Sequence, residues 1–88
     1  MKGSNRRHGI ARVPYHTARS RVMLYLRERE EPMPPSWIAG AIWPGHQMRA
    51  QGAAFAAGPI LDRLRKEGVV RWVCLTHPYP TWGWVLNN

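Results

Sequence analysis

The stretch that decides the fold is ILDRLRKEGVV, residues 60–70. Its first half places apolar side chains at the spacing of one helix face, and Gly68 then supplies a typical helix stop. Past this glycine the apolar period becomes two, with Val70, Trp72 and Cys74 on one side of the chain. The segment therefore predicts a helix that passes directly into a β-strand.

This strand is expected to be one arm of a β-hairpin. The sequence HPYP at residues 77–80 predicts a turn, and a second strand follows from Thr81 to about Leu86. We interpret three tryptophans as core or cross-strand partners within this hairpin: Trp72, Trp82 and Trp84. Cys74 alternates with Trp72 and is expected to be a small buried residue.

Upstream of the deciding stretch, a helix is expected over about residues 53–66. Its apolar face contains five residues at helical spacing: Ala53, Ala57, Ile60, Leu61 and Leu64. Gly58 and Pro59 interrupt the pattern, because a proline inside a helix costs about 3 kcal/mol. Two outcomes stay open: either Pro59 bends one helix, or Gly58 caps a new helix that starts at Pro59.

Two further helices are expected before that one. The first spans about residues 18–30, with Thr17 as its N-cap. A run of prolines ends it, and Pro35 suits the first position of a short second helix over about residues 35–43. A loop over about residues 44–52 then leads to the third helix.

The chain is expected to contain one domain and one arm. With 88 residues there is room for a single hydrophobic core, which we place in residues 15–88. Residues 1–14 contain several basic side chains, no acidic one and no apolar period. We therefore predict that they form a disordered basic arm.

The charge balance favours an acidic partner. The chain has thirteen Lys and Arg residues and five Asp and Glu residues, which gives a formal net charge of +8. Nucleic acid, an acidic protein or an anionic membrane surface would all suit that charge, and simple solubility is the plainer alternative. One cysteine, no apolar run of membrane-spanning length and no secretory signal together predict a cytoplasmic protein.

The predicted order of elements resembles the winged helix-turn-helix superfamily. Three segments are similar to bacterial and phage repressors of the multidrug-resistance and arsenic-sensor types: RVMLYLRE at 21–28, MPPSWIA at 33–39 and residues 60–70. The resemblance covers roughly residues 18–86. It implies an α+β fold, a three-helix winged helix-turn-helix with a C-terminal β-hairpin wing. It also implies binding of double-stranded DNA by a small transcriptional regulator.

In that superfamily the third helix enters the major groove and the wing touches the backbone or the minor groove. The resemblance implies base contacts from three residues: Gln47, Arg49 and Gln51. It implies phosphate or wing-tip contacts from four others: Arg63, Lys66, His77 and Tyr79. The arm adds two candidates for an adjacent minor groove, as in homeodomains: Arg6 and Arg7.

A protein-docking function is the alternative. The face of the third helix that includes Phe55 and Pro59 is nearly devoid of polar atoms, and base reading requires donors and acceptors. A winged-helix interaction module would instead dock through Trp37, Trp43 and Phe55. The partner would be another protein or a second copy, and a palindromic DNA site would also require two copies.

Catalysis and metal binding find little support. Cys74 and His77 have a C-x2-H spacing, but a metal site needs more ligands. No Ser/His/Asp constellation and no glycine-rich phosphate loop occur at an informative spacing. We therefore expect no enzyme activity, no bound metal and no cofactor.

Overall fold

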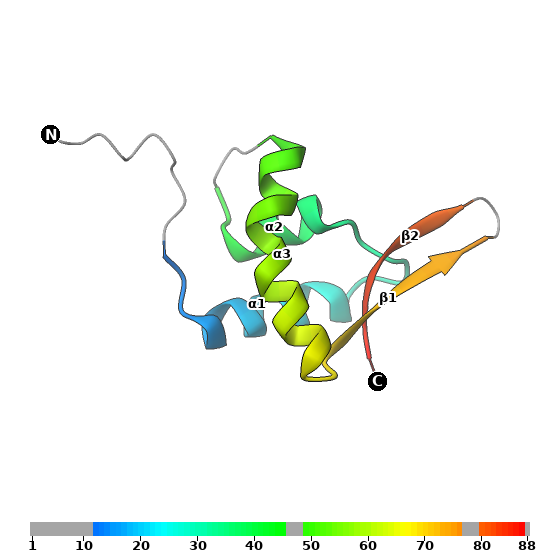
Figure 1. Cartoon of the computed structure of the whole chain (residues 1–88), viewed down its shortest axis with the longest axis horizontal. Coiled ribbons are helices and arrows are strands. Elements are labelled where there is room, and N and C mark those ends of the chain that lie inside the picture. Colours follow the sequence, from blue (N-terminus) through cyan, green and yellow to red (C-terminus); the bar gives the residue numbers. More distant parts are fainter. Residues whose placement is uncertain (1–11, 46–48, 77–79, 88) are drawn as a thin grey trace, which may run out of the picture.

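The computed structural model describes residues 12–45, 49–76 and 80–87. Three helices are followed by an antiparallel hairpin that extends to one side of them (Figure 1). The elements in chain order are α1 (Tyr15–Arg27), α2 (Pro35–Ile42), α3 (Ala50–Lys66), β1 (Val70–Leu75) and β2 (Thr81–Leu86). The predicted α+β order is confirmed, and the layout is winged-helix-like.

Helix α1 begins and ends about three residues earlier than the sequence predicted. The N-cap prediction for Thr17 is wrong, because Pro14 holds that position with a φ of −57°. The Pro14 carbonyl accepts the backbone N–H of Thr17 and of Ala18, each at 3.0 Å. Proline is tolerated at this position because its φ is fixed near the helical value. Its missing N–H costs no hydrogen bond, because N–H groups at the start of a helix have no partner within the helix.

Helix α3 is one continuous helix that includes Pro59, so the proline does not divide it. Pro59 removes one N–H donor, the partner of the Phe55 carbonyl one turn earlier. Both residues are exposed, so water can hydrate that carbonyl. The helix starts at Ala50, and Gln51 therefore belongs to its first turn and not to the preceding loop.

The hydrophobic core lies between the helices and the base of the hairpin. Helix α2 contributes Ile38, Ala39 and Ile42, and α3 presents its apolar face to them. The fully buried large side chains are Val22, Ile38, Ile42, Leu61, Leu64 and Val70. Trp43 is also buried, at 7% exposure. The expectation that Trp43 docks a partner is therefore wrong, because its ring seals this thin core.

The hairpin carries a third antiparallel partner that the sequence did not predict. Met33, between α1 and α2, forms a bridge to Trp84 on β2. The Met33 N–H donates to the Trp84 carbonyl at 3.1 Å, and the Trp84 N–H donates to the Met33 carbonyl at 2.9 Å. The sheet order is therefore Met33, β2, β1, and the outer edge of β1 has no strand beside it in the described part of the chain.

Only part of the hairpin packs on the core. Trp72 lies opposite Trp84, and their rings meet edge to face with centroids 5.4 Å apart, which confirms cross-strand packing for this pair. Trp72 and Trp82 are nevertheless 48% and 54% exposed. Cys74 is exposed as well, so its predicted burial is wrong. The cause is geometric: Val70 is the only buried residue of β1, and the rest of this strand extends past the core.

Candidate nucleic-acid interface

Helix α3 leaves one long face free. Ala53, Ala57, Leu61 and Leu64 face the core, whereas Phe55 on the opposite side is 86% exposed. The exposed face also contains Gln51, Gly52, Pro59, Asp62 and Lys66. Apart from Gln51, its first two thirds are small or apolar, and its charged residues lie in the last turns. A ligand that contacts this face would meet two chemically different halves.

The structure separates the predicted base-reading and phosphate-contacting residues. Arg49 is at the N-cap position of α3 and Gln51 is in its first turn, both exposed. Arg63 and Lys66 are exposed near the other end of the helix. Fourteen residues separate Arg49 from Arg63, which is about 21 Å along a helix. The other candidates lie outside the described residues: Arg6, Arg7, Gln47, His77 and Tyr79.

The basic residues at the C-terminal end of α3 already have acidic partners. Asp62 contacts Arg65 at 2.9 Å and Lys66 at 3.2 Å, and Glu67 contacts Arg63 at 3.4 Å. Hydrogen bonds from Arg65 and Lys66 lower the pKa of Asp62 below its ordinary value. Exposed ion pairs of this kind contribute little to stability. They do, however, reduce the net positive charge that Arg63 and Lys66 offer to a phosphate.

A polar cluster joins the start of α1 to the end of α3. The Tyr15 hydroxyl donates to Glu67 Oε1 at 2.8 Å, and the Arg63 guanidinium lies 3.7 Å from the centroid of the Tyr15 ring. Arg19 adds a contact to the same carboxylate at 3.7 Å. No local signal in the sequence could have revealed the cluster, because Tyr15 and Glu67 are 52 positions apart.

This cluster predicts a dependence of stability on alkaline pH. Partial burial raises the pKa of Tyr15 above its ordinary value, and the hydrogen bond to Glu67 raises it further. The protonated phenol therefore stabilises the fold below the ordinary pKa, and that contribution is lost as pH rises through the raised value. We expect Tyr15→Phe to be less stable than the wild type in urea at about pH 8, and the difference to shrink at about pH 11. A constant difference across that range would contradict the assignment.

Several arginines in the described residues have no acidic partner. Within residues 12–45, 49–76 and 80–87, no ion pair includes Arg12, Arg27, Arg49 or Arg71, and all four side chains are exposed. Arg21 differs, since its Nη1 donates to the Ile42 carbonyl at 2.7 Å and satisfies the end of α2. Arg49 is therefore the one predicted contact residue, among those described, that combines exposure with an unpaired charge.

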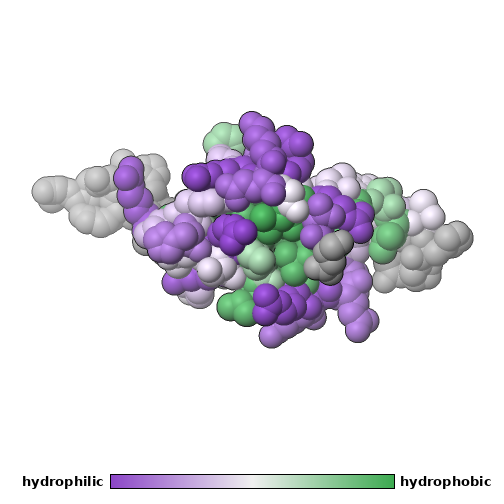
Figure 2. All heavy atoms as spheres, turned by 90° about the horizontal axis from the view of Figure 1, so that it is seen from below, coloured by the Kyte–Doolittle hydropathy of each residue, from purple (hydrophilic) through white to green (hydrophobic). Residues whose placement is uncertain are grey.

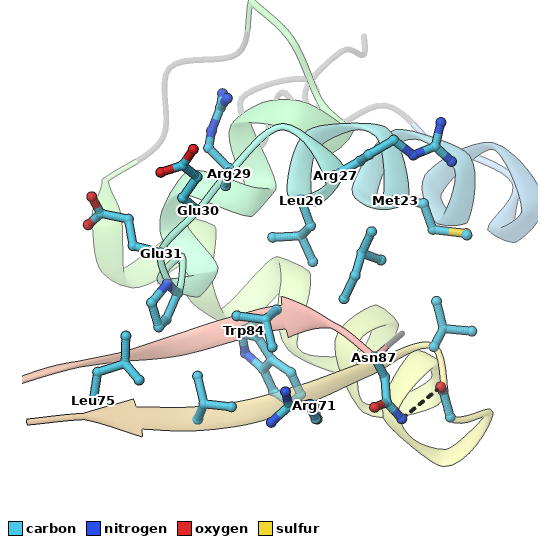
Figure 3. Close-up of a pocket in the computed structure, with 16 residues that line it drawn as sticks. Met23, Leu26, Arg27, Arg29, Glu30, Glu31, Arg71, Leu75, Trp84 and Asn87 are labelled. Carbon is cyan, nitrogen blue, oxygen red and sulfur yellow. Dashed lines mark hydrogen bonds between the residues drawn. The ribbon is translucent and has the colours of Figure 1, made fainter.

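A groove separates the C-terminal half of α1 from the hairpin (Figure 3). Its volume is about 680 Å³, and its apolar lining includes Leu26, Val73, Leu75 and Val85. Seen from below, apolar surface gathers near the middle of the molecule with hydrophilic residues around it (Figure 2). At one end of the groove the Asn87 amide donates to the Gly68 carbonyl at 3.1 Å. Sequence patterns gave no sign of this groove.

The described residues contain no group of three His, Cys, Asp or Glu side chains that could hold a metal ion. Over the same residues, no helix combines the length and the apolar character needed to cross a bilayer. No protein-family model, curated protein or solved structure matches this chain.

Proposed function

We propose that this chain binds double-stranded DNA, with the N-terminal end of α3 in the major groove and the hairpin against the backbone. A small transcriptional regulator of bacterial or phage type would work in this way. One observation carries the proposal: in a winged-helix-like layout, α3 is held by one face only and presents Arg49 and Gln51 at its free end. The charge of +8 supplies the attraction to phosphate.

The start of α3 has side chains suited to base edges. Arg49 can donate to guanine and Gln51 to adenine, and Phe55 can contact a thymine methyl group. Gly52 and the alanines around it keep this end of the helix narrow, so the backbone can approach the groove floor. Readout would thus come from the first turn and not from the whole helix.

Phosphate contacts would come from cations on several elements. Arg71 lies on the hairpin without an acidic partner among the described residues. Arg63 and Lys66 would contribute less, because each shares its charge with a carboxylate. The proposal also includes the candidates outside the described part of the chain: Arg6, Arg7, Gln47, His77 and Tyr79.

The test is fluorescence anisotropy with a labelled generic duplex at low and moderate salt. We expect Arg49→Gln to weaken binding about fivefold and to lower the salt slope by about one. The matched control is Arg65→Gln, which removes the same charge from an arginine already bonded to Asp62. It should change the affinity less than about twofold. Equal losses in both variants would mean that general charge attraction alone accounts for the binding. An absence of duplex binding at low salt would refute the proposal.

Protein docking remains the second candidate because two large apolar side chains are exposed. Trp37 on α2 is 63% exposed and Phe55 on α3 is 86% exposed. Exposed aromatic residues of this size are typical anchors of protein interfaces. Under this alternative, Phe55→Ser would leave duplex affinity unchanged, whereas under the DNA proposal it would weaken binding.

A further inference from the structure

The outer half of the hairpin has an exposed aromatic face. The strand register places Trp72 opposite Trp84 and Cys74 opposite Trp82. Residues directly opposite each other in an antiparallel pair share a face, so three indoles and one thiol lie together. The hairpin extends to one side of the helices (Figure 1), and Trp72 and Trp82 are 48% and 54% exposed. The fold therefore leaves these two large rings in solvent.

This aromatic face is distinct from the groove between α1 and the hairpin. From β1 the groove takes Arg71, Val73 and Leu75, but neither Trp72 nor Cys74. Side chains alternate between the two faces of a strand, so the exposed indole of Trp72 lies on the opposite side of the hairpin from the groove. Trp84 borders the groove as well, whereas Trp82 does not.

The surroundings of the aromatic face favour an anionic occupant. The two strands and the turn between them contain no Asp or Glu, and the chain as a whole has a formal charge of +8. Glu30 and Glu31 line the groove, on the other side of the hairpin. Asp62 and Glu67 are in ion pairs at the end of α3. Negative charge that would repel a phosphate backbone is thus either paired or on the far side of the hairpin.

The two exposed rings have a spacing that suits a strand of unpaired bases. Trp72 and Trp82 are diagonal neighbours across the strand pair, and such neighbours lie about 7–8 Å apart. Two steps of about 3.4 Å along a nucleic-acid strand cover a similar length. Trp84 meets the Trp72 ring edge to face at 5.4 Å, which holds that ring in place before a ligand arrives. Bases in a duplex already stack on each other, so only unpaired bases have a face free for an indole.

We propose that the aromatic face formed by Trp72 and Trp82 binds single-stranded DNA by stacking on its bases, while the positive charge of the chain attracts the phosphates. Every base has a π-face, so this binding tolerates different sequences. Discrimination in favour of RNA relies on contacts to the 2′-hydroxyl. Apart from the indole N–H groups and the Cys74 thiol, the described residues of this face have no polar side-chain group for such contacts. The proposal goes beyond duplex binding and does not depend on it.

The test is fluorescence anisotropy of the full chain at low salt with three labelled probes: an oligothymidylate of about twelve nucleotides, an oligouridylate of the same length and a duplex. We expect the wild type to bind the oligothymidylate and Trp82→Leu to weaken that binding about tenfold, because leucine stays apolar but has no ring. Trp82→Phe keeps a ring and should stay within about threefold of the wild type. The oligouridylate should bind no more tightly than the oligothymidylate.

The matched control is Trp37→Leu, the same substitution at a tryptophan on α2 that is 63% exposed. It should leave the oligothymidylate affinity within about twofold, and unchanged far-UV circular dichroism would confirm that each variant is folded. Trp82→Leu should leave the duplex affinity within about twofold, so a failure here differs from a failure of duplex binding.

Four results would overturn the proposal. They are no binding of the oligothymidylate at low salt, equal losses in Trp82→Leu and Trp37→Leu, tighter binding of the oligouridylate, and an oligothymidylate affinity that Trp82→Leu leaves unchanged. The last result would favour a protein partner for this face, because exposed tryptophans are also typical anchors of protein interfaces.

Discussion

Replacing Gly83 with alanine is expected to cost about 2–4 kcal/mol of the unfolding free energy. A Cβ at this position would lie 2.5 Å from the Met33 carbonyl oxygen and 2.8 Å from the Met33 nitrogen. These are backbone atoms, which cannot turn aside as the end of a flexible side chain can. The alanine would push Met33 away and break the two hydrogen bonds between Met33 and Trp84. Urea denaturation would measure the loss.

Gly40 provides the matched control for this substitution. It lies in α2, is exposed, and has no atom within 4 Å of its would-be Cβ. Gly40→Ala should therefore stabilise the chain by about 0.5–1 kcal/mol, because alanine loses less backbone entropy than glycine in a helix. If both variants were equally stable, the close approach of Met33 to β2 would not restrain the sheet.

The order of the elements was predictable because it depends on local rules. The shift from helical to alternating periodicity at Gly68 follows from neighbouring residues, and the structure places α3 and β1 on either side of that glycine, which has a φ of +79°. Few residues other than glycine adopt that conformation without strain. The second strand, Thr81–Leu86, was predicted with its observed bounds for the same reason.

The features that the sequence did not predict depend on contacts between distant residues. Met33 lies between Pro32 and Pro34, and its neighbours show no alternating apolar pattern. The sequence therefore did not predict its bridge to Trp84. Burial of Trp43 and exposure of Cys74 depend on where the small core ends. A two-residue period assigns side chains to a face, but it does not say how far along the strand that face is covered.

The candidate interface was predictable only in part. Residue type made Arg49 and Gln51 candidates for base contacts, because donors of this kind are needed at base edges. It could not reveal that Arg63 and Lys66 share their charges with Glu67 and Asp62. Sequence spacing allows those helical pairs, but the same residues could also turn outward, and only the structure shows which contacts form.

Replacing Leu61 with alanine should have the largest effect on stability, about 3–5 kcal/mol. Leu61 is 1% exposed, on the α3 face that packs against the core. Truncation would leave a cavity, because a close-packed core relaxes only partly around a missing side chain. In a domain of this size such a loss is a large part of the total stability. We therefore expect the Leu61→Ala chain to unfold at much lower urea concentration and, under the DNA-binding proposal, to lose duplex binding on mild heating.

Leu24→Ala makes the same truncation at a surface position and separates burial from side-chain type. Leu24 is on α1 and 56% exposed, so its loss should cost less than about 1 kcal/mol. Circular dichroism during urea titration would measure both variants, and anisotropy at two temperatures would follow binding. Because the buried face of α3 packs on the core, a large effect at Leu61 beside a small one at Leu24 would show that this packing holds the helix in place. Similar losses would mean that the buried face of α3 is not what holds it.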